Sequence, residues 1–557
     1  MADYVLLHWD PDGEPPHRVG WVRRAIEAAA GWRLARDEPG RLLALSTPGE
    51  LPVLRLSAGA VLIGEAWPRD DVDHAQVEAR PGGFEAQCRW LVETHWGAYV
   101  LVEAPRRGRA AMFRAPLGGL EAVVLEAGGV QALASSAPDW LLIGLAPALA
   151  LDWRAVQRQL VRPGAVAVTL GLHGAEALVP GTLRTASGAA VRLWSAAQAA
   201  RRAPGEASLC DLARDCVARQ VEGRRVLVEL SGGFDSAVVA WALGQAGGAR
   251  ERRLLNYHTD EPEGDERGFA RAAAQAAGLP LIERRKPDFT FDPRDLADVA
   301  SGWRPGIWGL DGAYDADVAG ECARLGADLL LTGKGGDTVF YQMPSPLIGA
   351  DHLRRRGLAG LFDPTLADLA AWTRRSVWSL LRAALAPRRE RPAPWMDEAA
   401  GLPPGKVLQV RGLVETLAFA GPSRRAAVAA FSHPLLAQPI VEHCLARSSV
   451  ELTQGRRDRA YARAAFAGRL PPQIAERYGK GDATAHFGRA VASRLDVFRD
   501  YLLEGLLVEH RVLDRRRLES MLTAEHLIWS GGAGQLLHAA ALEAWTRAWS
   551  RRLRGLG

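Results

Sequence analysis

A six-residue glycine-rich run, Ser-Gly-Gly-Phe-Asp-Ser at residues 231–236, constrains this chain more than any other feature. The apolar stretch 226–230 before it predicts a buried strand, and the apolar stretch 237–243 after it predicts a helix. Glycines let a backbone approach an anion closely, and the free N–H groups of a first helical turn favour negative charge. The sequence therefore predicts a phosphate-binding turn between a strand and a helix.

The residues of this turn limit which ligands it is expected to bind. The run matches neither the G-x-x-x-x-G-K loop nor the G-x-G-x-x-G fingerprint, and it looks like the pyrophosphate loop of enzymes that cleave ATP to AMP and pyrophosphate. Asp235 is unexpected in an anion site unless a cation is bound there, so it implies Mg²⁺. The residues expected to bind ATP here are Leu230, Ser231, Gly232, Gly233, Asp235 and Ser236.

A second glycine-rich turn, Thr332–Asp337, follows another apolar run at 328–331. We expect Gly333 and Gly335 to contribute to the ATP site. If the two strands are neighbours, Asp235 and Asp337 converge and share the Mg²⁺ that ATP phosphates carry. The alternative is that the two loops are unrelated surface turns. That alternative is weaker, because both loops are glycine-rich, contain an Asp and follow an apolar run.

Lysine is rare in this chain, since only four of its 69 basic residues are Lys: Lys286, Lys334, Lys406 and Lys480. A lysine inside a motif-like segment therefore suggests a need for a compact, strongly hydrated charge. Lys334 lies in the second turn, and Lys480 lies in the glycine-flanked segment Arg477–Gly481. Lys480 could neutralise charge on departing pyrophosphate, although a lysine in such a loop is more often simply solvated.

The pattern along the 557 residues predicts two domains in an α/β protein. Residues 1–195 are β-rich, and a Pro/Gly/Ala-rich stretch near 196–206 is a candidate linker. Residues 206–557 begin with alternating strands and helices, which predict a doubly wound parallel sheet, and beyond about residue 345 the pattern is mostly helical.

Composition excludes several classes of protein. The net charge of +5 is small for this length, so nucleic acid is not an expected partner. No uninterrupted apolar run of about 18 residues predicts a membrane span, and the N-terminus lacks a signal-peptide pattern. The five cysteines are scattered and form no metal-ligand spacing, which favours a reducing cytoplasm.

The motifs in their order resemble those of the asparagine synthetase family. That family carries S-G-G-x-D-S, then T-G-x-G-x-D, then an R-x-x-K segment in a helical region, which here are 231–236, 332–337 and 477–480. The resemblance implies a PP-loop synthetase domain that uses ATP and Mg²⁺. Residues 96–102 resemble the G-x-[FY] strand of the family's glutaminase domain, and residues 114–118 resemble its R-D-P-x-G turn, which implies an Ntn-type β-sandwich at the N-terminus.

Departures from the family pattern matter as much as the matches. A working glutaminase of this family has a nucleophilic Cys directly after Met1, but this chain has Ala2, and its first cysteine is Cys88. The family's N-G-E segment is also not recognisable. The first domain is therefore expected to be a degenerate glutaminase, and the amine must come from the substrate itself.

Two branches of the family fit a substrate that supplies its own amine. β-Lactam synthetases close a ring in a small amino acid, whereas lasso peptide cyclases join an Asp or Glu side chain of a peptide to the peptide's N-terminal amine. The first variable position of the T-G-x-G-x-D motif is Lys334 in this chain. It is Tyr in the β-lactam branch and Glu in true asparagine synthetases. The length and the Arg- and Trp-rich region 345–425 favour the lasso branch, and analogy with the β-lactam branch offers Glu415 as a general base.

The resemblance implies an ATP-dependent, AMP-forming macrolactam synthetase that acts on a precursor peptide, with a leader peptidase and a leader-binding protein as partners. A small-molecule amide ligase and a non-catalytic ATP- or peptide-binding scaffold remain alternatives. The Arg- and Trp-rich region is either a groove for an acidic peptide or a solvated helical surface. Its residues are Arg354, Arg355, Arg356, Arg374, Arg375, Arg388, Arg389, Arg391, Trp372, Trp378 and Trp395.

Overall fold

The structure is a computed structural model. It describes residues 3–556 except 11–18, 22–23, 25–30, 39–40, 48–50, 57–58, 70–81, 168, 261–263, 387–394, 455, 479–487, 490 and 531. Ala2, Lys480 and the arginines at 388, 389 and 391 lie outside the described residues.

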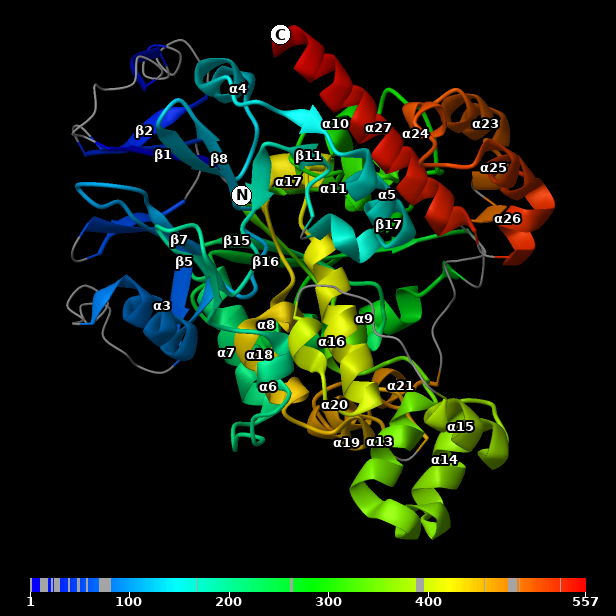
Figure 1. The fold of residues 1–557 in the computed structure, drawn as a ribbon. Helices are drawn as coiled ribbons and strands as arrows, with labels where there is room; N and C mark the ends of the chain where they lie inside the picture. The colour runs from blue at the N-terminus through cyan, green and yellow to red at the C-terminus, as the bar shows by residue number, and fades with distance from the viewer. Residues whose placement is uncertain are drawn as a thin grey trace.

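The N-terminal part is built from two six-stranded antiparallel sheets, with the orders β12-β8-β9-β1-β3-β2 and β14-β13-β7-β6-β5-β4. They lie at the blue and cyan end of the chain (Figure 1). The strands are β1 (Tyr4–Trp9), β2 (Arg33–Glu38), β3 (Leu42–Ser46), β4 (Val53–Arg55), β5 (Ala60–Pro68), β6 (His95–Glu103), β7 (Ala111–Arg114), β8 (Val123–Ala127), β9 (Val130–Ala134), β12 (Ala175–Ala177), β13 (Thr182–Arg184) and β14 (Ala190–Arg192).

Alternation along the strands explains why the two sheets pack face to face. In β1, Tyr4 and Leu6 point into the core between the sheets, while Val5 and Leu7 belong to the core on the outer face. Every residue of β1 is buried, so both of its faces are covered. The predicted N-terminal β-sandwich is confirmed. Its other elements are α3 (Gly83–Thr94), α4 (Asp139–Leu145), β10 (Ala150–Leu151), α5 (Trp153–Val161), η2 (Pro163–Ala167) and β11 (Leu172–His173).

The second half contains a five-stranded parallel sheet in the order β17-β16-β15-β18-β19. The strands are β15 (Arg225–Glu229), β16 (Glu251–His258), β17 (Leu281–Arg285), β18 (Leu329–Thr332) and β19 (Ala430–Ser432). The predicted doubly wound sheet is confirmed, and its switch of strand order falls between β15 and β18. The sequence pattern missed β19, because three residues inside a helical region are too few to show a strand period.

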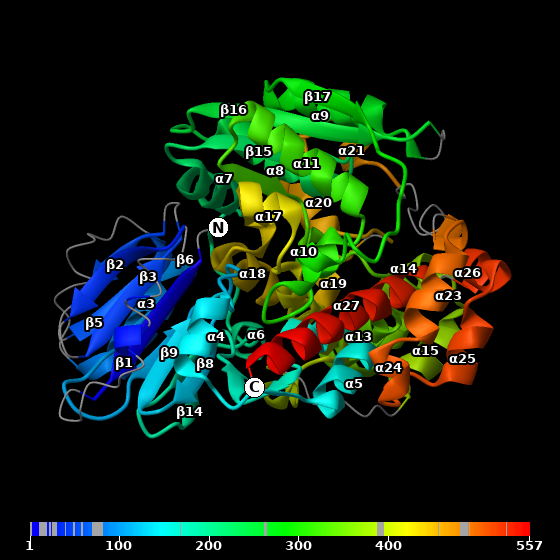
Figure 2. The same ribbon diagram turned by 90° about the horizontal axis from the view of Figure 1, so that it is seen from above.

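Helices cover both faces of the parallel sheet (Figure 2). Val226, Val228 and Leu254 pack on the side of α8 and α9, whereas Leu227 and Leu255 pack on the side of α11. Continuous apolar strands are expected where both faces of a sheet are buried. The helices on these faces are α7 (Leu209–Val221), α8 (Phe234–Gln245), α9 (Arg267–Ala277), α11 (Gly312–Leu325) and α17 (Arg424–Val428).

The remainder is the predicted helical extension. Its elements, with the short helices before it, are α10 (Ala297–Ala300), η4 (Ile307–Gly309), α12 (Gly336–Val339), α13 (Leu347–Arg356), η5 (Gly357–Phe362), α14 (Pro364–Trp372), α15 (Val377–Leu385), η6 (Asp397–Ala399), α16 (Pro404–Thr416), η7 (Leu417–Phe419), η8 (Pro434–Leu436), α18 (Gln438–Leu445), α19 (Ser449–Leu452), α20 (Ala460–Ala465), α21 (Pro472–Ala475), α23 (Leu495–Leu503), α24 (Leu506–Glu509), α25 (Arg515–Met521), α26 (Ala524–Ser530) and α27 (Ala533–Leu556). None of the described helices has both the length and the apolar character needed to cross a membrane.

Two features join the halves of the chain. The predicted linker begins as a helix, α6 (Ala196–Ala199), whose alanines are buried in a core shared with the parallel sheet. The long C-terminal helix α27 returns to contact α5 and β10 of the N-terminal part (Figure 1). On α27, the indole N–H groups of Trp545 and Trp549 both donate to the Gly302 carbonyl, each at 3.1 Å.

A buried ion pair also crosses between the halves. Arg304 is 6% exposed, its Nε lies 2.7 Å from Glu121 Oε2, and its Nη1 donates to the Val166 carbonyl at 2.9 Å. Burial alone would raise the pKa of Glu121, but Arg304 and Arg114 outweigh burial and lower that pKa. Glu121 is therefore a carboxylate whose charge depends on these two arginines.

We expect Arg304→Met to lower the free energy of unfolding by about 3–5 kcal/mol, because the change leaves Glu121 short of a partner in the interior. Urea unfolding at neutral pH measures this effect. The pKa of Glu121 is depressed, so the loss is full above the ordinary carboxyl pKa and shrinks as the pH falls through the folded value. Arg294→Met removes an arginine that is 90% exposed, and it should leave stability unchanged; equal effects of the two changes would contradict the prediction.

Candidate active site

The first glycine-rich turn joins the end of β15 to the start of α8. Gly232 has φ 81°, and a Cβ there would lie 3.0 Å from the Glu266 carbonyl oxygen and 3.2 Å from Cβ of Phe269. Only glycine fits this combination of a left-handed backbone and close approach without strain. The turn thus packs directly on the start of α9.

Hydroxyl groups fix the shape of this turn. The Ser231 N–H donates to Ser236 Oγ at 3.2 Å, and Ser236 Oγ donates to the Gly233 carbonyl at 3.0 Å. The Leu230 carbonyl accepts a hydrogen bond of 2.7 Å from Nδ2 of Asn256, which is fully buried on β16. These bonds hold the turn open at the N-terminus of α8, which favours an anion.

The second turn packs against the first. A Cβ on Gly333 would lie 2.5 Å from the Ser236 nitrogen, and one on Gly336 would lie 2.5 Å from Cγ of Asp235. A Cβ on Gly335, which has φ 88°, would collide with Leu436 at 2.4 Å. Because β15 and β18 are neighbours, the two turns share one edge of the sheet, at the switch of strand order where ligands of such sheets bind.

Asp235 and Asp337 converge on one guanidinium. Arg459 Nη2 lies 2.7 Å from Asp235 Oδ2 and also contacts Asp337 Oδ1. The Asp235 side chain is 13% exposed and that of Asp337 is 65% exposed, so the pair spans from the interior to solvent. Arg459 therefore occupies the position that the sequence predicts for a shared cation.

The donor set fits a magnesium ion that arrives with phosphate. Burial, together with the charge of Asp337, raises the pKa of Asp235 to about 7 in spite of Arg459. Asp235 Oδ1 is buried and has no hydrogen-bond partner among the described residues. Those residues also contain no group of three or more His, Cys, Asp or Glu that could hold a metal. Mg²⁺ commonly binds through one or two carboxylates plus substrate phosphates and water, which matches this pair.

Lys334 belongs to the second turn and lies near a largely buried polar cluster. Glu229, Tyr314, Asp315 and Arg425 form this cluster. Lys334 Nζ is 5.9 Å from the centroid of the Phe431 ring, which extends from β19. Burial, opposed by Glu229, lowers the pKa of Lys334 to about 7.

Lys480 lies outside the described residues, whereas Arg477 of the same segment is described. Arg477 pairs with both oxygens of Glu266 and lies 3.9 Å above the ring centroid of Phe269, next to Gly232. The position of the Lys480 ammonium group remains a prediction.

Glu415, at the end of α16, is not brought to the turns by any contact in the described part of the chain. Its Cγ would lie 2.8 Å from a Cβ on Gly164 of η2, so it packs against the N-terminal half. Burial raises the pKa of Glu415, with Arg411 opposing the shift. The same helix reaches α12 one turn earlier, where a Cβ on Gly412 would meet Thr338 at 2.8 Å.

The described residues of the Arg- and Trp-rich region include both buried and exposed side chains. Trp395 is fully buried, donates to the Pro180 carbonyl at 3.3 Å and packs edge-on against Trp194. That tryptophan anchors the helical extension to the N-terminal half. In contrast, Trp378 on α15 is 81% exposed. Arg355 and Arg356 form surface ion pairs with Glu451 and Asp363.

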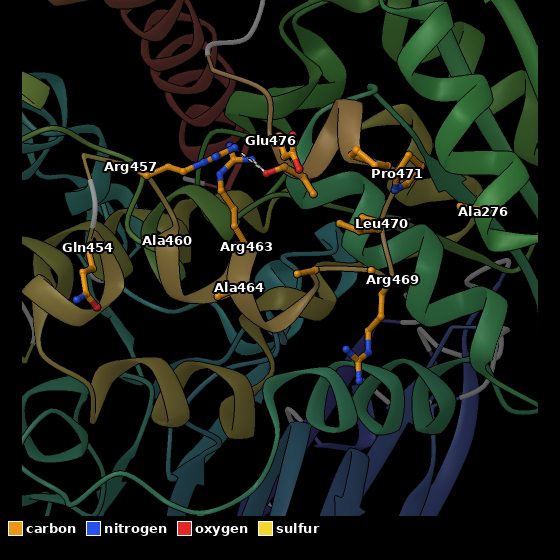
Figure 3. Close-up of a pocket in the computed structure, with 14 residues that line it drawn as sticks. Ala276, Gln454, Arg457, Ala460, Arg463, Ala464, Arg469, Leu470, Pro471 and Glu476 are labelled. Atoms are coloured by element: carbon orange, nitrogen blue, oxygen red, sulfur yellow. Dashed lines mark hydrogen bonds between the residues drawn. The ribbon is translucent and has the colours of Figure 1, made fainter.

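One cavity of the structure has a volume of about 710 Å³. Small side chains of α20 and the start of α21 form much of its wall, and among the described residues neither turn lines it (Figure 3). Arg457 and Arg463 both donate to the Ala475 carbonyl at 2.8 Å along one side. Arg463 also lies 4.8 Å above the ring centroid of Phe234, which connects this wall to the first turn.

Two residues of the candidate site were missed by sequence reasoning. Arg459 belongs to the charged run 456–459, which looks like a solvated surface, yet it is 6% exposed. Asn256 lies within a strand whose sequence pattern contains no recognisable motif. Only the fold brings either residue to the first turn, so no local pattern could have identified it.

Comparison with known proteins agrees with this fold and these motifs. The family model described as asparagine synthase matches residues 208–547, more than half of the chain. The chain therefore belongs to the asparagine synthase family, whose members are ATP-dependent ligases that form amide bonds and typically use Mg²⁺.

One curated relative and several solved structures are similar to parts of the chain. The microcin J25-processing protein McjC of Escherichia coli is 29% identical over 154 residues, which are 27% of this chain and 29% of McjC. The U34-tRNA thiolase NcsA from Methanococcus maripaludis is 16% identical with a TM-score of 0.18, covering 38% of this chain and 77% of that chain. A glutamine phosphoribosylpyrophosphate amidotransferase from B. subtilis is 10% identical with a TM-score of 0.20. The match covers 60% of this chain and 81% of that chain.

We expect Gly333→Ala to weaken nucleotide binding strongly, because a Cβ 2.5 Å from the Ser236 nitrogen must separate the two turns. Binding of a fluorescent ATP analogue in the presence of Mg²⁺ measures this effect. Gly320→Ala on α11 is a matched control, since a Cβ there meets nothing within 4 Å. It should bind nucleotide normally and gain slightly in stability; normal binding by both variants would contradict the packing argument.

Proposed function

We propose that this protein is an ATP-dependent lasso peptide cyclase. It activates an Asp or Glu side-chain carboxylate of a precursor peptide as an acyl-adenylate, with release of pyrophosphate, and joins it to the peptide's N-terminal amine. The single observation that best supports this proposal is the convergence of the two glycine-rich turns, with Asp235 and Asp337 beside each other at the switch of strand order.

The proposed nucleotide site uses the residues of both turns. The phosphates of ATP contact the N–H groups and hydroxyls of residues 231–236, with Gly333 and Gly335 allowing the second turn to approach. Asp235 and Asp337 hold Mg²⁺, which supplies charge neutralisation for the leaving pyrophosphate. Lys480 adds a second positive charge.

The source of the amine distinguishes this proposal from glutamine-dependent synthesis. With Ala2 in place of a nucleophilic cysteine, the N-terminal half is a degenerate glutaminase and supplies no ammonia. The substrate must carry its own amine, as a peptide does at its N-terminus. Similarity to McjC, which processes microcin J25, supports a processing reaction of this kind. A leader peptidase and a leader-binding protein are the proposed partners, and residues 1–195 and 206–557 are the proposed domains.

Mass spectrometry of a candidate precursor peptide, incubated with the protein, Mg²⁺ and ATP, tests the proposal when AMP is followed in parallel. Loss of one water from the peptide with an equal amount of AMP is the expected result. AMP formation with free amino acids but with no peptide would instead favour a small-molecule amide ligase. A protein that binds ATP and forms no AMP with either substrate would be a binding scaffold.

We expect Asp337→Asn to abolish peptide-dependent AMP formation and to weaken Mg²⁺-dependent ATP binding, since it removes a carboxylate from the proposed metal site. Asp288→Asn, at a position 84% exposed, is the matched control and should retain both. The two readouts are AMP by chromatography and the Mg²⁺ dependence of ATP binding by calorimetry. Full activity of the Asp337 variant would exclude the metal assignment.

We expect Lys480→Ala to slow AMP formation far more than it weakens ATP binding, because its charge is needed where negative charge develops on the leaving group. Rapid-quench kinetics give the rate of AMP formation, and equilibrium titration gives the affinity for ATP. An unchanged rate constant would show that Lys480 is a solvated loop residue.

A further inference from the structure

We propose that the cavity of about 710 Å³ beside α20 and α21 is a docking groove for an acidic, extended segment of the precursor peptide, away from the peptide groups that react. The inference rests on the proposed function, and it deepens that function by separating where the peptide docks from where it reacts. Ligand pockets in proteins commonly have volumes of roughly 300–1,000 Å³, so the cavity is large enough for a short stretch of peptide.

Small residues leave the floor of this groove open. Ala460 and Ala464 lie on α20, and Ala467, Gly468 and Pro471 follow it before α21 (Figure 3). Ala464 and Ala467 are exposed to solvent. Because no long side chain projects from these positions, the backbone of an extended peptide can approach the helix closely.

The charged residues of the groove determine which peptide fits it. The lining contains three arginines and one glutamate, namely Arg457, Arg463, Arg469 and Glu476. Arg463 is buried and pairs with Asp458 at 3.2 Å. Positive charge therefore exceeds negative charge in the lining, and acidic side chains complement it better than basic ones.

Two of these arginines have no carboxylate partner in the part of the chain that the structure describes. Arg457 Nη2 donates to the Ala475 carbonyl at 2.8 Å, and its guanidinium lies 4.6 Å from the ring centroid of Tyr478. Arg469 Nη1 donates to the Ala465 carbonyl at 3.3 Å. In Figure 3 these two arginines lie at different ends of the lining. Each guanidinium keeps further N–H groups that can bind a carboxylate, which is the strongest kind of hydrogen-bond partner for arginine.

The wall of the groove continues to the proposed nucleotide site. Arg463 lies 4.8 Å above the ring centroid of Phe234 in the first turn. Tyr478 directly follows Arg477, which pairs with Glu266 at the start of α9. Neither glycine-rich turn lines the groove among the described residues, so a peptide bound there leaves the phosphate site open. This shared wall favours the substrate, rather than an unrelated partner protein, as the occupant.

The first experiment measures binding of a fluorescein-labelled decapeptide of alternating Glu and Ala, acetylated at its N-terminus, by fluorescence anisotropy without ATP. Wild type should bind this probe at least about tenfold more tightly than a matching Lys and Ala decapeptide, because charge-assisted hydrogen bonds form only with the acidic probe. Added salt should weaken the binding. Equal affinity for the two decapeptides would overturn the proposal.

Two variants locate the binding. Arg469→Glu reverses a charge and Ala464→Trp fills the floor, and each should weaken binding of the acidic probe by about tenfold or more. Both positions are exposed, so both variants should fold. Arg382→Glu on α15 and Ala524→Trp on α26 change exposed residues outside the groove and should bind as wild type does. Loss of binding in Arg382→Glu with none in Arg469→Glu would place the segment on the Arg- and Trp-rich region and overturn the proposal.

A precursor peptide then separates this inference from the proposed function. We expect the precursor to compete with the acidic probe, and Arg469→Glu to raise the KM for the precursor while kcat and the KM for ATP stay unchanged. A precursor that closes a ring but does not compete would show that another acidic partner uses the groove, which overturns the assignment to the substrate. If the precursor competes and wild type forms neither AMP nor ring, the groove assignment stands and the proposed function fails.

Discussion

The close packing of two glycine-rich turns is the constraint on which the candidate site depends. Gly333 and Gly336 leave no room for a side chain because the backbone of Ser236 and the carboxyl group of Asp235 fill that space. This packing requires that β15 and β18 be neighbours, which the doubly wound strand order provides. It also forces two carboxylates together, at an energetic cost that a cation must offset.

Arg459 offsets part of that cost. Its guanidinium contacts both carboxylates, and in return they hold its own charge in a largely buried position. Burial raises the pKa of Asp235, and the like charge of Asp337 adds to that increase in spite of Arg459. The polar cluster near Lys334 differs, because Arg425 pairs with both Glu229 and Asp315, so that each carboxylate there has a partner of opposite charge.

The helical extension and the N-terminal half support the site from outside. Trp395, Arg304 and helix α27 each connect the N-terminal sandwich to the second half of the chain. An N-terminal half that is joined this firmly acts as part of the scaffold for the parallel sheet.

The sequence alone determined the elements and the chemistry of the two turns. Apolar runs before and after residues 231–236, and the repeated placement of Asp after glycines, are local patterns that predict a strand, an anion site and a paired carboxylate. Strand order, the role of Arg459, the burial of Trp395 and the strand β19 were decided only by tertiary structure. Those features depend on contacts between residues far apart in the chain, and neither periodicity nor residue type encodes such contacts.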